Sequence, residues 1–265
     1  MKRKRVVNKE EREMIFDTHS HYDDEQFNTD REDIINQLNE KGIKAVNVGA
    51  SFAGCIESYN LAKKYPHIYA AVGIHPDEIA DLTDENYTKI KEMAMSEKVV
   101  AIGEIGLDYH WMVCEEEVQK NGFIRQIELA KEISKPINVH SREAANDTLS
   151  IIKEYGKDAT GIIHCFSYSK EIAKEYLNMG YYIGIGGVVT FKNSKKLKEV
   201  VEYVPLDRIV LETDCPYMSP EPYRGKRNSS LYLTYVATSI GQIKGVSKEE
   251  VEDITFKNAL NVYKI

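Results

Sequence analysis

Apolar residues alternate between two spacings along this chain. Short runs rich in β-branched residues are separated by longer segments with apolar positions every three or four residues, as at Phe123, Ile127 and Ala130. The short runs predict strands, and the longer segments predict helices. Eight runs are expected to be strands: Ile15–Thr18, Ile43–Val48, Tyr69–Ile74, Val99–Glu104, Ile137–His140, Gly161–Cys165, Tyr181–Ile185 and Arg208–Glu212.

Strands that alternate with helices in this way pair in parallel, because each helix returns the chain to the starting edge of the sheet. Eight such units in about 250 residues match the size of a TIM (β/α)8 barrel, and no linker rich in Pro, Gly and Ser divides them. A doubly wound open sheet is the alternative, but no G-x-G-x-x-G follows the first run. We therefore expect an α/β protein with a single barrel domain over residues 14–265.

The start of the chain, MKRKRVVNKEERE, lies outside this pattern. Met14 stands directly before the first run and could itself be an original start. Residues 1–13 are therefore expected to be a disordered N-terminal extension. Their basic cluster could also be read as a nucleic-acid arm, which is the less favoured interpretation.

Metal-binding residue types stand at the C-terminal ends of the predicted strands, where active sites of (β/α)8 barrels lie. An isolated histidine after an apolar run is more often a buried core residue than a ligand. When several histidines converge on one barrel mouth, that expectation is reversed. Of the seven histidines in the chain, only His67 and His110 do not lie at a predicted strand end. The residues at strand ends are His19, His21, His75, Glu104, His140, His164 and Asp214.

Six of these residues, all except His75, are too many ligands for one tetrahedral zinc ion. They suit two divalent ions about 3.5–4 Å apart that share a carboxylate. Glu104, on the fourth run, is the expected bridge. The remaining ligands divide into His19, His21 and Asp214 for one ion and His140 and His164 for the other.

Composition restricts the partners of such a site. The formal net charge of −7 argues against a broad basic surface, so any nucleic acid would be held by local positive charge. The four cysteines form no C-x-x-C pair, which fits reduced thiols in the cytoplasm. No apolar run approaches the ~20 residues of a membrane span, so we expect no membrane association. We also expect the protein to be a monomer.

Several motifs together resemble the TatD-type metal-dependent deoxyribonucleases. They are FDTHSHYDD, VGIHP, GEIGLDYHW, NVHSREA, HCFS and ETDCPYMSPEPYRGKRN, in that order from about residue 14 onward. The resemblance implies an amidohydrolase-like TIM barrel, dependence on divalent metal, and exonucleolytic hydrolysis of phosphodiester bonds in DNA. One departure is the pair Ser229-Ser230, where the family pattern has an acidic residue and proline.

The expected roles follow from the chemistry that the resemblance implies. Asp214 can bind a metal through one oxygen and take the proton of the attacking water with the other, so it is the candidate general base; Glu104 is assigned to the catalytic set with it. His75, Arg142 and Arg224 are expected to bind substrate, the two arginines through phosphate. Lys226 and Arg227, which follow Arg224 in the same segment, are further candidates for phosphate binding. Four imidazoles favour zinc, manganese or iron, although magnesium could support turnover.

Three further interpretations stay open on the sequence alone. The first is RNA in place of DNA. The second is a metal-dependent hydrolase of a small ester or amide, or of aminoacyl-tRNA; relatives of that kind commonly bridge their metals with a modified lysine, where this chain has Glu104. The third is a metal-binding scaffold without catalysis.

Overall fold

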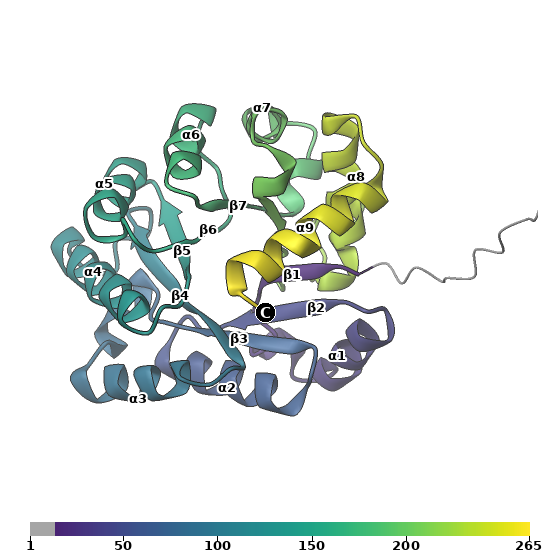
Figure 1. The fold of residues 1–265 in the computed structure, drawn as a ribbon. Helices are drawn as coiled ribbons and strands as arrows, with labels where there is room; N and C mark the ends of the chain where they lie inside the picture. The colour runs from purple at the N-terminus through teal and green to yellow at the C-terminus, as the bar shows by residue number, and fades with distance from the viewer. Residues whose placement is uncertain (1–13) are drawn as a thin grey trace, which may run out of the picture.

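A computed structural model describes residues 14–265 as eight parallel strands ringed by helices (Figure 1). The predicted extension, residues 1–13, lies outside the described residues. The strands are β1 (Phe16–Ser20), β2 (Lys44–Val48), β3 (Ile68–Val72), β4 (Val99–Asp108), β5 (Ile137–Arg142), β6 (Gly161–Ile163), β7 (Tyr182–Ile185) and β8 (Ile209–Leu211).

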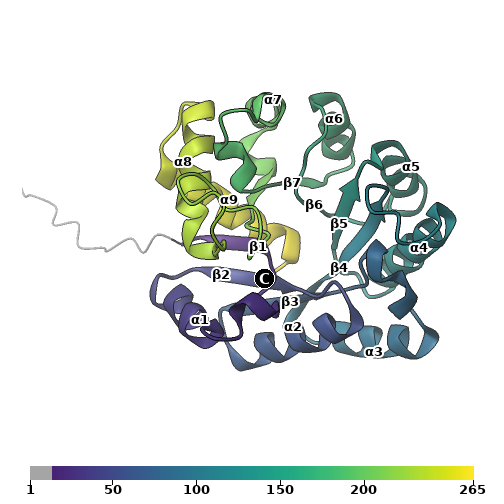
Figure 2. The ribbon, with the colours of Figure 1, turned by 180° about the vertical axis from the view of Figure 1, so that it is seen from behind.

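Helices follow the strands and form the outer layer seen in Figures 1 and 2. The α-helices are α1 (Arg31–Glu40), α2 (Phe52–Lys64), α3 (Asp84–Ala94), α4 (Glu116–Glu132), α5 (Ala145–Tyr155), α6 (Lys170–Asn178), α7 (Lys195–Tyr203), α8 (Leu233–Lys244) and α9 (Lys248–Tyr263). Short 3-10 helices are η1 (Glu25–Phe27), η2 (Pro76–Asp81), η3 (Gly187–Thr190), η4 (Leu206–Arg208) and η5 (Ser230–Tyr232). Among residues 14–265, no helix has the length and apolar character that crossing a membrane requires.

The sheet runs in the order β1 to β8 and closes on itself. Closure uses β1 and the segment just after β8: Ser20 bridges Cys215 in parallel, and the His21 amide donates to the Cys215 carbonyl at 2.8 Å. This confirms the predicted single-domain barrel. It also brings the first and last strands together, so residues nearly 200 positions apart can share one site.

Several strands differ in extent from the sequence prediction. The fourth does not end at Glu104 but continues to Asp108, because Gly106, Leu107 and Asp108 still pair with β5. Glu104 thus lies within its strand. β6 ends at Ile163 and β8 ends at Leu211. His164 and Glu212, which were predicted to lie within these strands, therefore lie on the segments that follow them.

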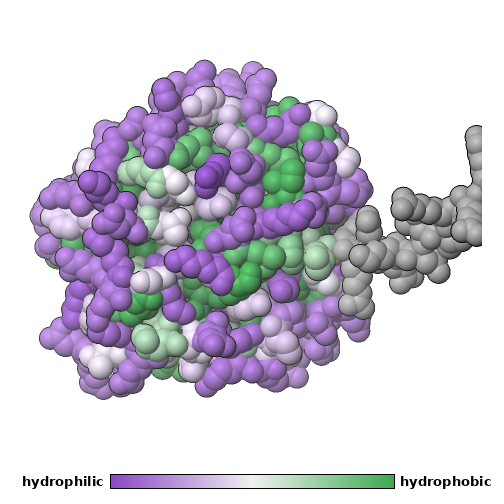
Figure 3. Space-filling model, viewed as in Figure 1, coloured by the Kyte–Doolittle hydropathy of each residue, from purple (hydrophilic) through white to green (hydrophobic). Residues whose placement is uncertain are grey.

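α9, which had no counterpart in the predicted pattern, covers the N-terminal end of the barrel. In Figure 1 it crosses the front of the sheet, and Figure 3 shows hydrophobic residues near the middle of this face with hydrophilic residues around them. Phe256 and Tyr263 from α9 pack against Phe16. The Tyr263 hydroxyl donates to the Thr18 carbonyl at 3.1 Å and accepts from the Asn138 amide at 3.2 Å. This end is therefore closed, and the opposite end carries the loops.

Candidate metal centre

The two histidines of β1 meet at their ring nitrogens. Nε2 of His19 lies 3.1 Å from Nε2 of His21, and Nδ1 of His21 is held by the Val48 carbonyl at 2.8 Å. A regular strand would place Asp17 on the same face as both. The pairing of β1 with β2 shifts register between Asp17 and Ser20, and the Asp17 carboxylate instead accepts hydrogen bonds from Thr213.

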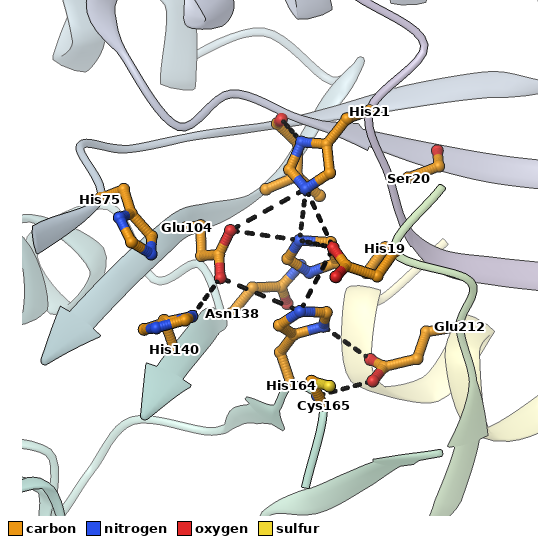
Figure 4. A network of polar contacts seen from close by, with 12 residues as sticks. His19, Ser20, His21, His75, Glu104, Asn138, His140, His164, Cys165 and Glu212 are labelled. Atoms are coloured by element: carbon orange, nitrogen blue, oxygen red, sulfur yellow. Dashed lines mark hydrogen bonds and ion pairs between the residues drawn. The ribbon is translucent and has the colours of Figure 1, made fainter. Parts of the chain in front are cut away.

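Glu104 separates the histidines into two groups (Figure 4). Its Oε2 faces β1, at 3.3 Å from Nε2 of His19 and 4.0 Å from Nε2 of His21. Its Oε1 faces the other side, at 2.8 Å from Nδ1 of His140 and 3.9 Å from Nε2 of His164. The carboxylate is almost fully buried. Its two oxygens thus face two different pairs of histidines.

Asp214 approaches the same point from the segment after β8. Its Oδ1 lies 3.3 Å from Nε2 of His21 and 3.6 Å from Nε2 of His164. The backbone there is in the left-handed region, with φ of 57°, a conformation that aspartate and asparagine tolerate better than most residues. The Asp214 amide donates to the His19 carbonyl at 2.9 Å, which fixes this turn against β1.

These contacts fit metal ligands better than hydrogen bonds among the residues themselves. Corners of a tetrahedron around zinc, about 2.0–2.1 Å from the ion, lie roughly 3.3 Å from one another. The contacts of His21 with His19 and Asp214, at 3.1 and 3.3 Å, match that spacing. Nδ1 of His19 is also buried without a hydrogen-bond partner in the described structure. The residues present therefore fit a divalent metal.

The pKa values of the candidate ligands indicate that their surroundings attract positive charge. Burial would lower the pKa of each imidazole, but neighbouring carboxylates outweigh it for three of them. The pKa is raised to about 10 for His21 beside Asp214, and to about 9 for His140 beside Asp108 and for His164 beside Glu212. Without metal, these imidazoles hold protons at neutral pH that a metal must displace.

Other groups shift in the opposite direction. Burial and the neighbouring charge of His164 lower the pKa of His19. Burial would raise the pKa of Glu104, but its interactions with His19 and His140 hold that pKa well below its usual range. A neutral imidazole and an ionised carboxylate are the forms in which these side chains bind metals.

Two buried carboxylates orient the second pair of histidines. Oδ2 of Asp108 lies 3.0 Å from Nε2 of His140, and Oε2 of Glu212 lies 3.0 Å from Nδ1 of His164. Such partners fix the ring orientation of metal-bound histidines. This contact of Glu212 was not predicted; its position two residues before Asp214, at the end of an apolar run, is the sequence signal that points to it.

His75 lies beside this cluster. Its ring packs edge-on against that of His140, with centroids 4.3 Å apart, and its Nδ1 accepts a hydrogen bond from the Asp77 amide at 3.1 Å. Burial and the charge of His140 lower the pKa of His75 to about 4. A neutral imidazole at the edge of the metal site can contact a substrate without adding charge.

The predicted basic residues do not form one cluster. Arg142 is exposed and lies over the Trp111 ring, 5.4 Å from its centroid. Arg224 lies over the ring of Phe191 at 4.3 Å, on a different loop of the same end of the barrel. Arg227 pairs with Asp30 at 2.5 Å, so its charge is already neutralised.

The serine pair that departs from the family pattern is part of a well-packed turn. Ser229 accepts a hydrogen bond from the Leu231 amide and begins η5, while Ser230 donates to Asp17 at 2.6 Å and contacts the Tyr22 hydroxyl at 2.7 Å. Burial raises the pKa of Asp17 to about 7. This turn, together with Asn228, anchors the segment that carries Asp214.

Comparison with known proteins agrees with this geometry. A family model described as TatD related DNase matches residues 16–264. The chain is 46% identical to the uncharacterized metal-dependent hydrolase YabD of Bacillus subtilis, covering 95% of this chain and all of that protein. It is 34% identical to the uncharacterized metal-dependent hydrolase YcfH of Escherichia coli K12, covering 95% and 96% of the two chains.

A solved structure shows the same architecture. The crystal structure of YJJV, a TatD homologue from Escherichia coli K12, superposes with a TM-score of 0.88 at 27% identity and covers 95% of this chain and 98% of that one. The resemblance expected from the motifs is thereby confirmed over the whole barrel. This chain belongs to the TatD-related DNase family of metal-dependent hydrolases.

Proposed function

We propose that this protein hydrolyses phosphodiester bonds in DNA, removing nucleotides from an end, with two divalent ions held by the six residues around Glu104. The observation that carries the proposal is the placement of the Glu104 oxygens, one toward His19 and the other toward His140. A carboxylate shared in this way is typical of two-metal hydrolases that act on phosphate esters. The family name adds support for DNA as the substrate.

The chain's own groups can carry the remaining steps. Bound divalent cations would lower the pKa of a water molecule and place positive charge next to the phosphoryl oxygens. Oδ1 of Asp214 faces the histidines, so its second oxygen is available to take the proton of the attacking water. Arg142, exposed at the rim, can bind a phosphate, and the Trp111 ring beside it can stack on a base.

The test is digestion of end-labelled substrates by purified protein with added magnesium, manganese or zinc. Single-stranded DNA, double-stranded DNA, RNA, a p-nitrophenyl ester and an aminoacyl-tRNA are compared. We expect mononucleotides to be released from DNA, and Glu104→Gln to abolish their release, while the matched surface change Glu117→Gln has no effect. Turnover of the ester or of aminoacyl-tRNA with intact DNA would contradict the proposal.

A further inference from the structure

A cavity of about 270 Å³ adjoins the metal ligands on the side of β7. Asp214 and Glu212 line it next to the metal site, and Cys165 continues that wall. Apolar side chains from three loops form the rest: Phe166 after β6, Val188 in η3, and Leu197 at the start of α7. The cavity is therefore continuous with the place where bond cleavage is proposed.

Glycines of β7 and of the turn after it form one wall of this cavity. β7 and the turn after it read IGIGG, and no metal ligand was expected from this strand. A Cβ on Gly184 would lie 2.2 Å from Oε2 of Glu212, and one on Gly187 would lie 2.1 Å from the Met218 carbonyl. The glycines thus allow the neighbouring segments to approach closely while adding no side chain to the cavity.

Positive charge borders this cavity, although the chain as a whole is acidic. Lys192, Lys195 and Lys196 are exposed on the loop after β7 and the first turn of α7, and Lys196 lines the cavity itself. Within residues 14–265, none of the three lies within ion-pair distance of a carboxylate, unlike Lys153, which pairs with Glu175 at 2.6 Å. The three lysines place local positive charge at this edge of the cavity.

We propose that this cavity receives the nucleoside next to the scissile phosphate, and that Lys192, Lys195 and Lys196 bind the phosphates that follow it along the strand. The inference rests on the proposed function and names the subsite that holds the nucleotide. The volume of the cavity lies just below the ~300–1,000 Å³ of typical small-molecule sites. A cavity of this size suits one nucleoside and is too small for an oligonucleotide. Apolar walls can contact the face of any base, so recognition here is tolerant of sequence.

A larger hollow elsewhere does not compete for this role. It measures about 530 Å³ and lies between α1 and α2, lined by polar residues such as Arg31, Glu57 and Lys64. None of the six metal ligands lines it. A nucleotide bound there would lie away from the groups that could cleave it.

The first experiment narrows the cavity and compares two phosphodiesters. Thymidine 5′-(p-nitrophenyl phosphate) carries a nucleoside, and methyl p-nitrophenyl phosphate does not. In Val188→Phe, we expect the ratio of kcat/KM for the first over the second to fall about tenfold, the scale of one lost base contact. Ser167→Trp, at the exposed rim, should lower the same ratio if Val188→Phe does not fold, and Ile56→Phe on α2 is the matched control.

The second experiment measures binding, not turnover. A phosphorothioate oligodeoxynucleotide is titrated by fluorescence anisotropy at several salt concentrations. Lys195→Glu/Lys196→Glu should weaken binding and lower the slope of log K against log salt by about 1–2. Lys41→Glu/Lys157→Glu makes the same charge change on loops at the opposite end of the barrel and should leave that slope as in the parent.

The outcomes separate the two proposals. If the parent cleaves DNA but the substrate ratio and the salt slope are unchanged in these variants, the nucleoside subsite is refuted and the proposed function stands. If the parent cleaves neither DNA nor the two phosphodiesters, the proposed function fails and the subsite fails with it. A substrate ratio that falls in both Val188→Phe and Ser167→Trp, with a reduced slope in the lysine variant, supports the subsite.

Discussion

Asp214→Asn removes the proposed general base while keeping the shape of the site. The amide retains one oxygen that can occupy the place of Oδ1, 3.3 Å from Nε2 of His21. Asparagine also tolerates the left-handed backbone at this position, where φ is 57°. The change therefore tests proton transfer with little effect on folding.

The expected loss follows from the single function removed. General base help contributes about 10²–10⁴-fold, so the single-turnover rate of DNA cleavage should fall about 100-fold or more, equivalent to ~2.7 kcal/mol in the barrier. Affinity for DNA should change little, because Arg142 and the lysines beside α7 are untouched. Asp253→Asn, at an exposed position of α9, is the matched control and should behave as the parent.

The assay combines three measurements on the same preparations. Single-turnover cleavage of labelled DNA reports the chemical step, equilibrium titration reports affinity, and elemental analysis reports bound metal. Near-parental cleavage by Asp214→Asn would refute the role of Asp214 as base. Loss of metal in parallel with loss of cleavage would show instead that the charge of Asp214 is needed to hold the ion.

Four further predictions concern the same site. Glu104→Ala should reduce bound metal per molecule with native circular dichroism; unchanged metal content would refute the bridge. Glu212→Gln should lower metal affinity about 10- to 100-fold, because His164 loses the partner that fixes its ring, and unaltered zinc titration would argue against this. Arg142→Ala should weaken DNA binding by about tenfold and leave metal content intact, as anisotropy and elemental analysis can show. Zinc uptake at pH 7 should release up to three protons, because the three imidazoles with raised pKa are protonated without metal, and affinity should rise with pH up to about pH 9–10; calorimetric heats independent of buffer would contradict this.

The sequence was sufficient for the barrel because periodicity and strand ends carry the needed information. Apolar runs with β-branched residues mark strands whatever their exact bounds, and the order of strands then follows from parallel pairing. The predicted fourth strand ended at Glu104, the first charged residue after the apolar run. Pairing with β5, which depends on the neighbouring strand, extends β4 to Asp108.

The side-chain contacts around the candidate ligands could not be predicted from the sequence, because they join residues that are far apart along the chain. The direction of Asp17 is decided by a register shift between β1 and β2, and strand alternation gives no sign of it. Arg227 was a candidate for phosphate binding until the fold placed Asp30 beside it. The contact of Glu212 with His164 depends on the order of strands in the barrel. β6 and β8 lie on either side of β7, which brings the residues that follow these two strands together.

The helix under the barrel determines when the metal centre can be completed during synthesis. Tyr263 of α9 holds Thr18, the residue before His19, and Asn138, two residues before His140. Strand β1 is synthesised before the other strands of the barrel, yet its hydrogen-bonded neighbour after β8 and its support from α9 are synthesised after all of them. His19 and His21 therefore wait for most of the barrel to be synthesised before all the residues that surround and support them are present.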